Sequence, residues 1–393
     1  MFEFPISIRY LAVLSLLAGV VGLTSCSVTD LGKKDLTAVS GEPLKLRDLT
    51  DEETTGDLSV KDQFPDYNRT TASSSAHIFL IAGGAESPNY LQEIVDHRRL
   101  LIQSGHPASG ISCFYVKPNP AEYEAHREQF DQLATEVEGF YLAAPHLIYR
   151  HMREAIKGEP EFVYLYAAGK GRKPIWVDQA NGVERELAQH HTEYFGQYRI
   201  DLAGGPSGHM NSRMRLEALR DGIAIEHLLF TPRYLKQVLA EFPEETPKYV
   251  VLQADYSGGF VRSNFEELAE DTLTNVPNLA VLTATRHDRD SFRGTSGEVY
   301  SNFGEIFLDQ LRKSDDSVAN LNWRLIADEV AAEVRMREVG AAIAEEVASS
   351  PVYFSSWEEA SFAEETATPR AVVEPVEAEE ADSGSLVSAT FEG

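Results

Sequence analysis

Five short apolar runs dominate the middle of the chain, and each ends in a turn or a polar stretch. The runs are His77 to Ala82, Ile111 to Val116, Phe162 to Tyr166, Tyr249 to Ala254 and Leu279 to Thr283. Because they show no alternation of polar and apolar residues, they predict strands that are buried on both faces of a parallel sheet. Between them, amphipathic stretches such as 90–104 and 121–134 predict the helices that cross over from one strand to the next.

This order of elements predicts an α/β fold class, with a mostly parallel central sheet and helices on both of its faces. Open sheets of this kind bind ligands outside the carboxyl ends of their strands, so we expect a site there. The segment 176–230 is long and irregular, and it predicts inserted loops with a hairpin around 194–202. Beyond Ser314, apolar residues at helical spacing predict one or two amphipathic helices: Val318, Leu321, Ile326, Val330, Val334, Val339, Ile343 and Val347.

The N-terminus has the pattern of an export signal. Arg9 precedes an apolar run, Leu11 to Val21, which is too short for a mature membrane-spanning helix. The run ends in Leu23-Thr24-Ser25-Cys26, which resembles the lipobox of bacterial lipoproteins. The resemblance implies cleavage before Cys26, a lipid on its thiol, and, from Ser27, sorting to the outer membrane facing the periplasm. An ordinary secretory signal with a chance cysteine is the alternative.

Composition divides the whole chain into five parts. We predict a signal peptide over 1–25, a polar disordered tether over 26–75, a folded domain over 76–313, a helical extension over 314–355 and an acidic disordered tail over 356–393. The tail carries ten acidic residues against one basic residue, so we expect it to be solvated. Binding of a basic partner is the alternative for the tail.

The overall charge restricts the partners. Among 393 residues, 35 are Lys or Arg and 62 are Asp or Glu, which gives a formal net charge of −27. Binding of nucleic acid needs a basic surface, so we expect no nucleic-acid partner. Contact with a membrane is expected only through a lipid on Cys26. Two cysteines exclude a disulfide framework.

Four segments resemble, in the correct order, the legumain family of cysteine peptidases, which has the caspase-like fold. Two of them carry the family's dyad: 164–171 (YLYAAGKG) resembles the strand that ends in Ser-His-Gly or Gly-His-Gly, and 251–260 (VLQADYSGGF) resembles the strand that ends in Ser-Ala-Cys-Tyr-Ser-Gly-Gly-Phe. The other two are 81–84 with 89–90, and 282–292 with 300–304, which resembles the block beside the substrate pocket. The resemblance implies a caspase-like three-layer sandwich.

The two dyad positions depart from the family. Lys170 stands where the resemblance places the catalytic His, and Asp255 stands where it places the catalytic Cys. A cysteine peptidase needs a thiolate and a base with a pKa near the working pH, and neither residue supplies these. Because their charges are opposite, Lys170 and Asp255 are expected to form an ion pair that joins two strand ends and locks the former active site.

The resemblance also implies a substrate groove, formed by backbone N–H groups and pocket residues that do not belong to the dyad. Gly171 and the turn at Ser257 and Gly258 would offer N–H groups to a substrate, and Arg286, Asp290 and Ser291 would line its pocket. For the glycines, turn geometry alone is an equal alternative.

Other candidates for chemistry are weaker. Cys113 lies within an apolar strand and is expected to be a buried thiol. His190, His191 and His209 show no spacing typical of a metal site, so we predict no metal and no cofactor. His209 as a displaced base is possible in a shifted alignment. Ser257 lacks the flanking glycines of a nucleophile elbow.

These observations predict a catalytically impaired peptidase homologue, anchored by lipid in a bacterial cell envelope, that binds a peptide or an envelope protein in the old groove. Two alternatives stay open: an active peptidase with an atypical dyad, and a structural lipoprotein with a vestigial groove.

Overall fold

A computed structural model describes residues 72–83, 88–116, 127–175, 180, 182–190, 195–202, 228–263, 266–292, 301–314 and 316–357. The predicted signal peptide, the lipid site at Cys26, almost all of the tether and of the acidic tail, and His191 and His209 lie outside the described residues. Across the ranges that are described, no helix is both long enough and apolar enough to cross a bilayer.

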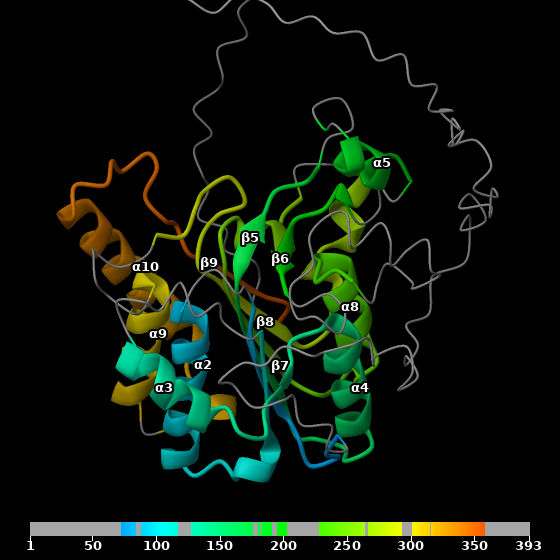
Figure 1. Ribbon diagram of the computed structural model, residues 1–393, viewed down its shortest axis with the longest axis vertical. Helices are drawn as coiled ribbons and strands as arrows, with labels where there is room; N and C mark the ends of the chain where they lie inside the picture. The colour runs from blue at the N-terminus through cyan, green and yellow to red at the C-terminus, as the bar shows by residue number, and fades with distance from the viewer. Residues whose placement is uncertain are drawn as a thin grey trace, which may run out of the picture. The chain divides into compact units, whose positions relative to one another are not determined.

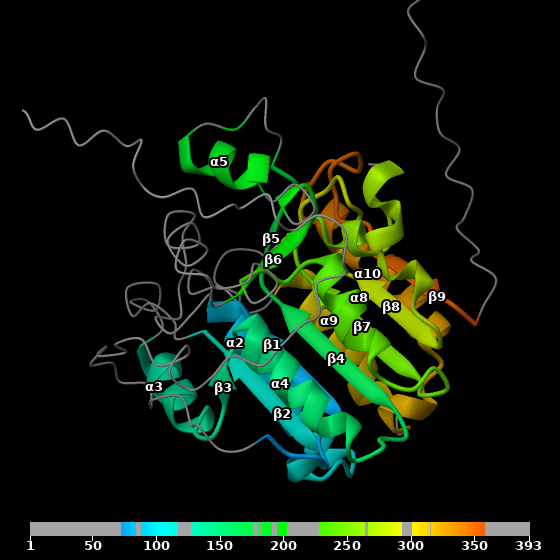
Figure 2. The same cartoon turned by 90° about the vertical axis from the view of Figure 1, so that its right-hand side faces the viewer.

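A seven-stranded sheet forms the centre of the fold, with the strand order β3-β2-β1-β4-β7-β8-β9 (Figure 2). All neighbours are parallel except β9, which runs antiparallel to β8. The strands are β1 (Ile78–Ala82), β2 (Ile111–Tyr115), β3 (Tyr141–Leu142), β4 (Val163–Ala168), β7 (Lys248–Gln253), β8 (Leu279–Thr283) and β9 (Val352–Ser355). The five strands predicted from apolar runs are therefore confirmed.

Helices cover both faces of the sheet (Figure 1). One layer contains α2 (Pro88–Gln103), α3 (Arg127–Glu136), α9 (Asn302–Lys313) and α10 (Trp323–Gly340), and the other contains α4 (Pro145–Ile156) and α8 (Pro232–Ala240). A further helix, α5 (Gly182–His190), lies outside these layers, and short 3-10 turns occupy 108–110, 257–260, 266–271, 273–275 and 318–320. The predicted α/β sandwich with a mostly parallel sheet is confirmed.

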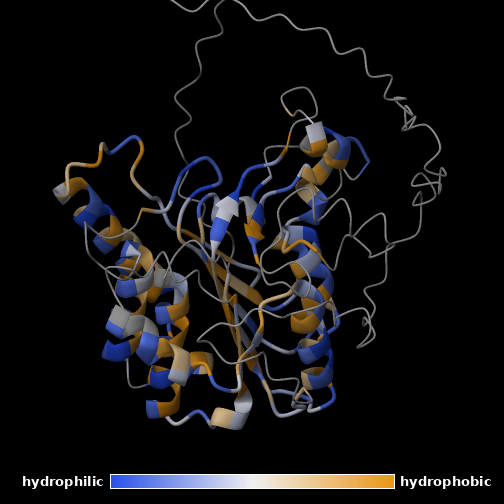
Figure 3. Cartoon of the chain, in the orientation of Figure 1, coloured by the Kyte–Doolittle hydropathy of each residue, from blue (hydrophilic) through white to orange (hydrophobic). Residues whose placement is uncertain are grey.

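The strands β1, β2, β4, β7 and β8 each contribute to two cores, which explains why their residues are mostly apolar without alternation. On β1, Ile78 and Leu80 pack into the core beneath α2, α9 and α10, whereas Phe79 and Ile81 pack into the core beneath α4 and α8. Figure 3 shows the apolar strands between helices whose outer faces are polar. Burial of both faces thus accounts for the pattern in the sequence.

The predicted hairpin around 194–202 is wrong in its pairing. The strand β6 (Arg199–Asp201) does form, but its antiparallel partner is β5 (Lys170–Arg172), which directly follows β4. Ile200 also bridges to Phe230. A local pattern indicates a strand but not its partner, and here the partner is supplied by the end of a distant strand.

The C-terminal segment follows its prediction in part, because the helix α10 forms with Ile326, Val330 and Val334 buried, but it differs beyond Gly340. The helix α10 ends at Gly340, and Ala342 has a φ of 64°, which is outside the helical region. Val339 and Val347, which the helical pattern placed on an apolar face, are 43% and 52% exposed. The chain instead returns as β9 and adds the antiparallel edge strand to the sheet.

The topology defines where a site should lie. From β1 the chain moves outward to β2 and β3, then returns to β4 on the other side of β1 and moves outward through β7 and β8. The strand order therefore reverses between β1 and β4, and ligands of open α/β sheets bind beside such a point at the carboxyl ends of the strands.

Candidate functional site

A cavity of about 450 Å³ lies at the carboxyl edge of the sheet. Its lining comes from the segments that follow β1, β4, β7 and β8, together with the residue that precedes α9. The lining residues are Tyr90, Lys170, Gln253, Asp255, Asp290, Ser291, Phe292 and Ser301. Most of them are polar, so the cavity suits a ligand that forms hydrogen bonds.

The expected ion pair is present at the centre of this lining. Lys170 Nζ lies 3.4 Å from Asp255 Oδ2, and the other carboxylate oxygen of Asp255 accepts a hydrogen bond from the backbone N–H of Ser291 at 2.8 Å. The juxtaposition of Lys170 and Asp255 is confirmed. The pair is less buried than a locked site requires, because the Lys170 side chain is 41% exposed and that of Asp255 is 12% exposed.

The exposure of the two side chains determines how much the ion pair is expected to contribute to the free energy of unfolding. A partly exposed ion pair contributes about 0–1 kcal/mol to the free energy of unfolding. We expect Lys170→Ala to cost less than Asp255→Ala, because Asp255 also accepts the Ser291 N–H. A double-mutant cycle in urea, with Lys170→Ala, Asp255→Ala and the double variant, should give a coupling energy below about 1 kcal/mol. A coupling energy above about 3 kcal/mol would show that the pair behaves as a fully buried one.

The glycines of the predicted groove allow close backbone contacts and form backbone hydrogen bonds within the protein. A Cβ on Gly171 would lie 1.8 Å from the carbonyl oxygen of Asp255, so only glycine allows the two backbones to approach. The N–H of Gly258 donates to the carbonyl of Thr285 at 2.8 Å, and the N–H of Gly259 donates to that of Tyr256 at 2.9 Å. The N–H groups expected from the Gly258 turn are therefore already engaged within the protein.

The other predicted site residues are divided between the cavity and its surroundings. Asp290 and Ser291 line the cavity. Arg286 does not line it, and its guanidinium pairs with the carboxylate of Asp288 at 3.1 Å. Ser257 is 1% exposed and its hydroxyl accepts the N–H of Thr285, so it serves the turn after β7. Cys113 is buried in β2, and burial raises the pKa of its thiol to about 12, which rules out a reactive thiolate.

Tyr256 holds the backbone turn next to Asp255 through two hydrogen bonds. It adopts a left-handed backbone with a φ of 56°, and its N–H donates to the carbonyl of Arg289 at 2.9 Å. Burial, and then the hydrogen bond to Asp290, raise the pKa of the Tyr256 hydroxyl, which therefore stays protonated and donates to the Asp290 carboxylate. The loop after β8 is thereby attached to the end of β7.

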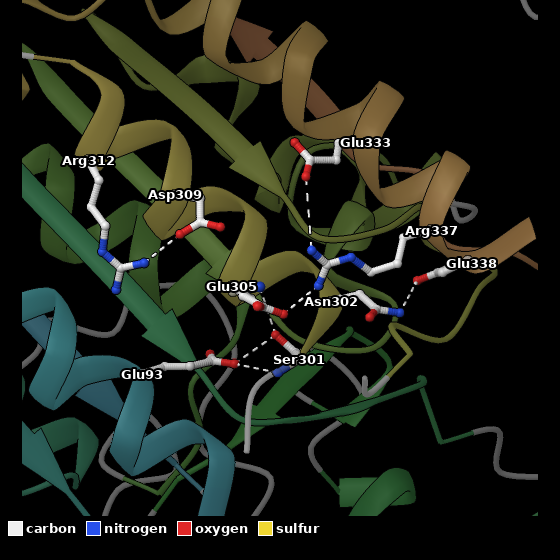
Figure 4. A network of polar contacts seen from close by, with 10 residues as sticks. Glu93, Ser301, Asn302, Glu305, Asp309, Arg312, Glu333, Arg337 and Glu338 are labelled. Carbon is white, nitrogen blue, oxygen red and sulfur yellow. Dashed lines mark hydrogen bonds and ion pairs between the residues drawn. The ribbon is translucent and has the colours of Figure 1, made fainter. Parts of the chain in front are cut away.

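A buried carboxylate supports the opposite wall of the cavity. Glu93 on α2 is fully buried, and its Oε1 accepts hydrogen bonds from the N–H of Ser301 at 2.8 Å and from its hydroxyl at 2.7 Å (Figure 4). Its Oε2 accepts from the hydroxyl of Tyr166 at 3.0 Å. Desolvation raises the pKa of Glu93 to about 7, although the hydrogen bonds oppose this shift. Glu93 thus joins α2, β4 and the start of α9.

A second buried carboxylate, Glu338 on α10, holds the loop after β8. It accepts a hydrogen bond from the N–H of Ser349 at 2.6 Å. It also accepts one from the side-chain amide of Asn302 at 3.4 Å (Figure 4). The hydroxyl of Ser349 in turn donates to the carbonyl of Asp290 and accepts the N–H of Phe292, both at 3.2 Å. The C-terminal extension therefore positions the cavity wall formed by 290–292.

Titration of Glu93 predicts a pH dependence of stability. Its folded pKa of about 7 lies above its ordinary value of 4.5, so the contribution is fully present below pH 4.5 and is lost as the pH rises toward 7. Glu93→Gln removes this titration. We expect the free energy of unfolding of the parent, minus that of Glu93→Gln, to fall by about 1.4 kcal/mol per pH unit between pH 4.5 and 7. Urea titrations at several pH values measure this difference, and a constant difference would contradict the assignment.

Two buried histidines titrate in the opposite sense. Burial lowers the pKa of His97 to about 3 and that of His151 to about 4, so each contributes stability above pH 6.5 that is lost as the pH falls. Both histidines are present in the parent and in Glu93→Gln. Their effect therefore cancels in the difference between the two proteins.

Sequence reasoning missed Gln253, Glu93 and Glu338. Gln253 is the single uncharged polar residue at the end of the apolar run 249–254, and this was the available signal. Glu93 and Glu338 lie on amphipathic helices and read as surface charges in the sequence. In the part of the chain that the structure describes, no three His, Cys, Asp or Glu residues are grouped in a way that suits a metal ion.

A comparison with solved structures finds chains that are similar to this one at low sequence identity. Protein GSU0716 from Geobacter sulfurreducens matches with a TM-score of 0.40 at 10% sequence identity, over 72% of this chain and 94% of its own. Caspase-1 from Spodoptera frugiperda matches with a TM-score of 0.35 at 12% identity, over 76% of this chain and 94% of its own. No protein-family model and no curated protein matches the chain.

Proposed function

We propose that this protein is a catalytically impaired homologue of the caspase-fold cysteine peptidases of legumain type, which binds a peptide segment in the cavity without cleaving it. The observation that carries the proposal is the Lys170–Asp255 ion pair of 3.4 Å, at the positions where the resemblance places the His and the Cys. A carboxylate is a poor nucleophile toward an amide, and a Lys ammonium has no lone pair to accept a proton.

The hydroxyl groups of the cavity do not replace the dyad. The hydroxyl of Ser301 donates to Glu93 and accepts the N–H of Gly304 at 2.8 Å, so it caps α9, and Ser301 is 2% exposed. No histidine is among the described lining residues that could activate Ser291. The cavity therefore offers hydrogen-bond partners to a ligand but no activated nucleophile.

The proposal includes the location of the protein. A lipid on Cys26 would hold it in a bacterial envelope, and the polar segment 26–75 would act as a tether between the lipid and the folded domain. The support for this part is the Leu23-Thr24-Ser25-Cys26 sequence after an apolar run.

Retention of peptides on the immobilised full chain tests the proposal. We expect a subset of a library of acetylated, amidated ten-residue peptides to be retained and to be recovered intact by mass spectrometry. Ser291→Trp fills the cavity and should abolish retention, whereas Asp316→Trp at an exposed position outside the cavity should not. Absence of retention, or equal retention by Ser291→Trp, would overturn the proposal.

A further inference from the structure

We propose that the cavity recognises a cationic side chain, a lysine ammonium or an arginine guanidinium of the bound segment, through acceptors on Gln253, Ser291 and Asp290. This inference rests on the proposed function and names the chemistry of its ligand. Three independent features of the lining support it.

The first feature is an unpaired buried amide. Gln253 is the last residue of β7, is 2% exposed and lines the cavity. Its Oε1 is buried and has no hydrogen-bond partner among the described residues. Burial of an unpaired acceptor costs free energy, and a ligand that donates a hydrogen bond to this oxygen would recover that cost.

The second feature is the hydroxyl of Ser291. Its Oγ is buried without a partner in the described part of the protein, although its backbone N–H is held by Asp255. The backbone is therefore fixed, and the hydroxyl is a buried polar group without a partner on a residue that lines the cavity. Together with Gln253, this residue provides a second acceptor that the protein itself does not use.

The third feature is the charge of the lining. Asp255 offsets the charge of Lys170, which leaves the carboxylate of Asp290. Within the described residues Asp290 forms no ion pair, and the hydroxyl of Tyr256 that contacts it is neutral. The lining therefore carries one positive and two negative charges, which favour a cation over a carboxylate ligand.

The donor inventory of the ligand agrees with this set of acceptors. An ammonium has three N–H donors and a guanidinium has five, and neither group has an acceptor. A neutral amide carries no charge, so it would leave the carboxylate of Asp290 without a counter-charge. A cation is therefore the chemistry that uses Gln253, Ser291 and Asp290 together.

Calorimetric titration of the full chain with matched peptides tests the inference. The probes are acetylated, amidated pentapeptides of alanine whose central residue is Arg, Lys, citrulline or norleucine. At low salt, we expect the Arg and Lys peptides to bind at least about tenfold more tightly than the citrulline and norleucine peptides. Added salt should reduce this preference.

Two variants test the named residues. Asp290→Asn should remove most of the preference for a cation, whereas Asp288→Asn, a carboxylate of the same loop that pairs with Arg286 outside the cavity, should preserve it. Gln253→Met should weaken binding of the Arg peptide about tenfold while it maintains or raises the melting temperature, because the unpaired oxygen is removed. A purely structural Gln253 would lose stability in this variant.

The outcomes separate this inference from the proposed function. Equal binding of the Arg and citrulline peptides, or a loss of stability in Gln253→Met, would overturn the inference and leave peptide binding intact. Failure of all four peptides to bind, together with failure of the peptide library, would overturn both.

Discussion

Glu93→Ala is expected to lower the free energy of unfolding by about 3–5 kcal/mol. The substitution removes the acceptor of the Ser301 N–H, the Ser301 hydroxyl and the Tyr166 hydroxyl, all of which are buried. It also leaves a cavity beneath Gly304, whose Cα faces the Glu93 carboxylate. Chemical denaturation of the purified chain near pH 6 measures the loss.

Glu93→Gln is the matched control for this effect. A glutamine retains the volume and one acceptor for Ser301, so its cost should stay near about 1 kcal/mol. Equal destabilisation by alanine and glutamine would contradict the assignment of the effect to the side-chain volume and the acceptor oxygen that glutamine retains.

Gly171→Ala is expected to destabilise the protein by about 3 kcal/mol and to separate Lys170 from Asp255. The new methyl group would lie 1.8 Å from the carbonyl oxygen of Asp255 and 2.8 Å from its backbone nitrogen. Because these are backbone atoms of a strand end, no side chain can move away to make room. Thermal unfolding and the loss of peptide retention should report the change together.

Gly340→Ala provides the comparison for Gly171→Ala. Nothing lies within 4 Å of the position of its Cβ, and it is the last residue of α10. Alanine favours a helix over glycine by about 1 kcal/mol, so this variant should be unchanged or slightly more stable. A similar loss in both variants would indicate that glycine content, and not the close approach at Asp255, explains the effect.

The strands were predictable because each faces two cores. The runs that became β1, β2, β4, β7 and β8 are apolar without alternation, and their carboxyl ends meet at one edge of the sheet. The strand β9 was missed because it lies at an edge, where Val352 and Tyr353 are only partly buried. The partner of β6 was missed because pairing over a long separation leaves no local signal.

The candidate site could be predicted from the sequence only in part. Lys170 and Asp255 each follow a predicted strand, and β4 and β7 are neighbours, so their meeting followed from the topology. The family resemblance of the block 282–292 placed Arg286 in the pocket, but the structure pairs its guanidinium with the carboxylate of Asp288 outside the cavity lining. The unpaired oxygen of Gln253 and the buried carboxylates of Glu93 and Glu338 depend on the packing of distant segments, which single positions in a sequence do not reveal.

We propose that the Lys170–Asp255 site binds peptides without hydrolysing them. Fluorogenic peptides with Asn, Asp, Lys or Arg before the scissile bond test it most directly, with the unmodified full chain assayed beside Asp255→Asn and the double variant Lys170→His/Asp255→Cys. We predict no cleavage by the unmodified chain, and cleavage only where the double variant restores a thiol and an imidazole. Cleavage by the unmodified chain that is lost in Asp255→Asn would contradict the claim.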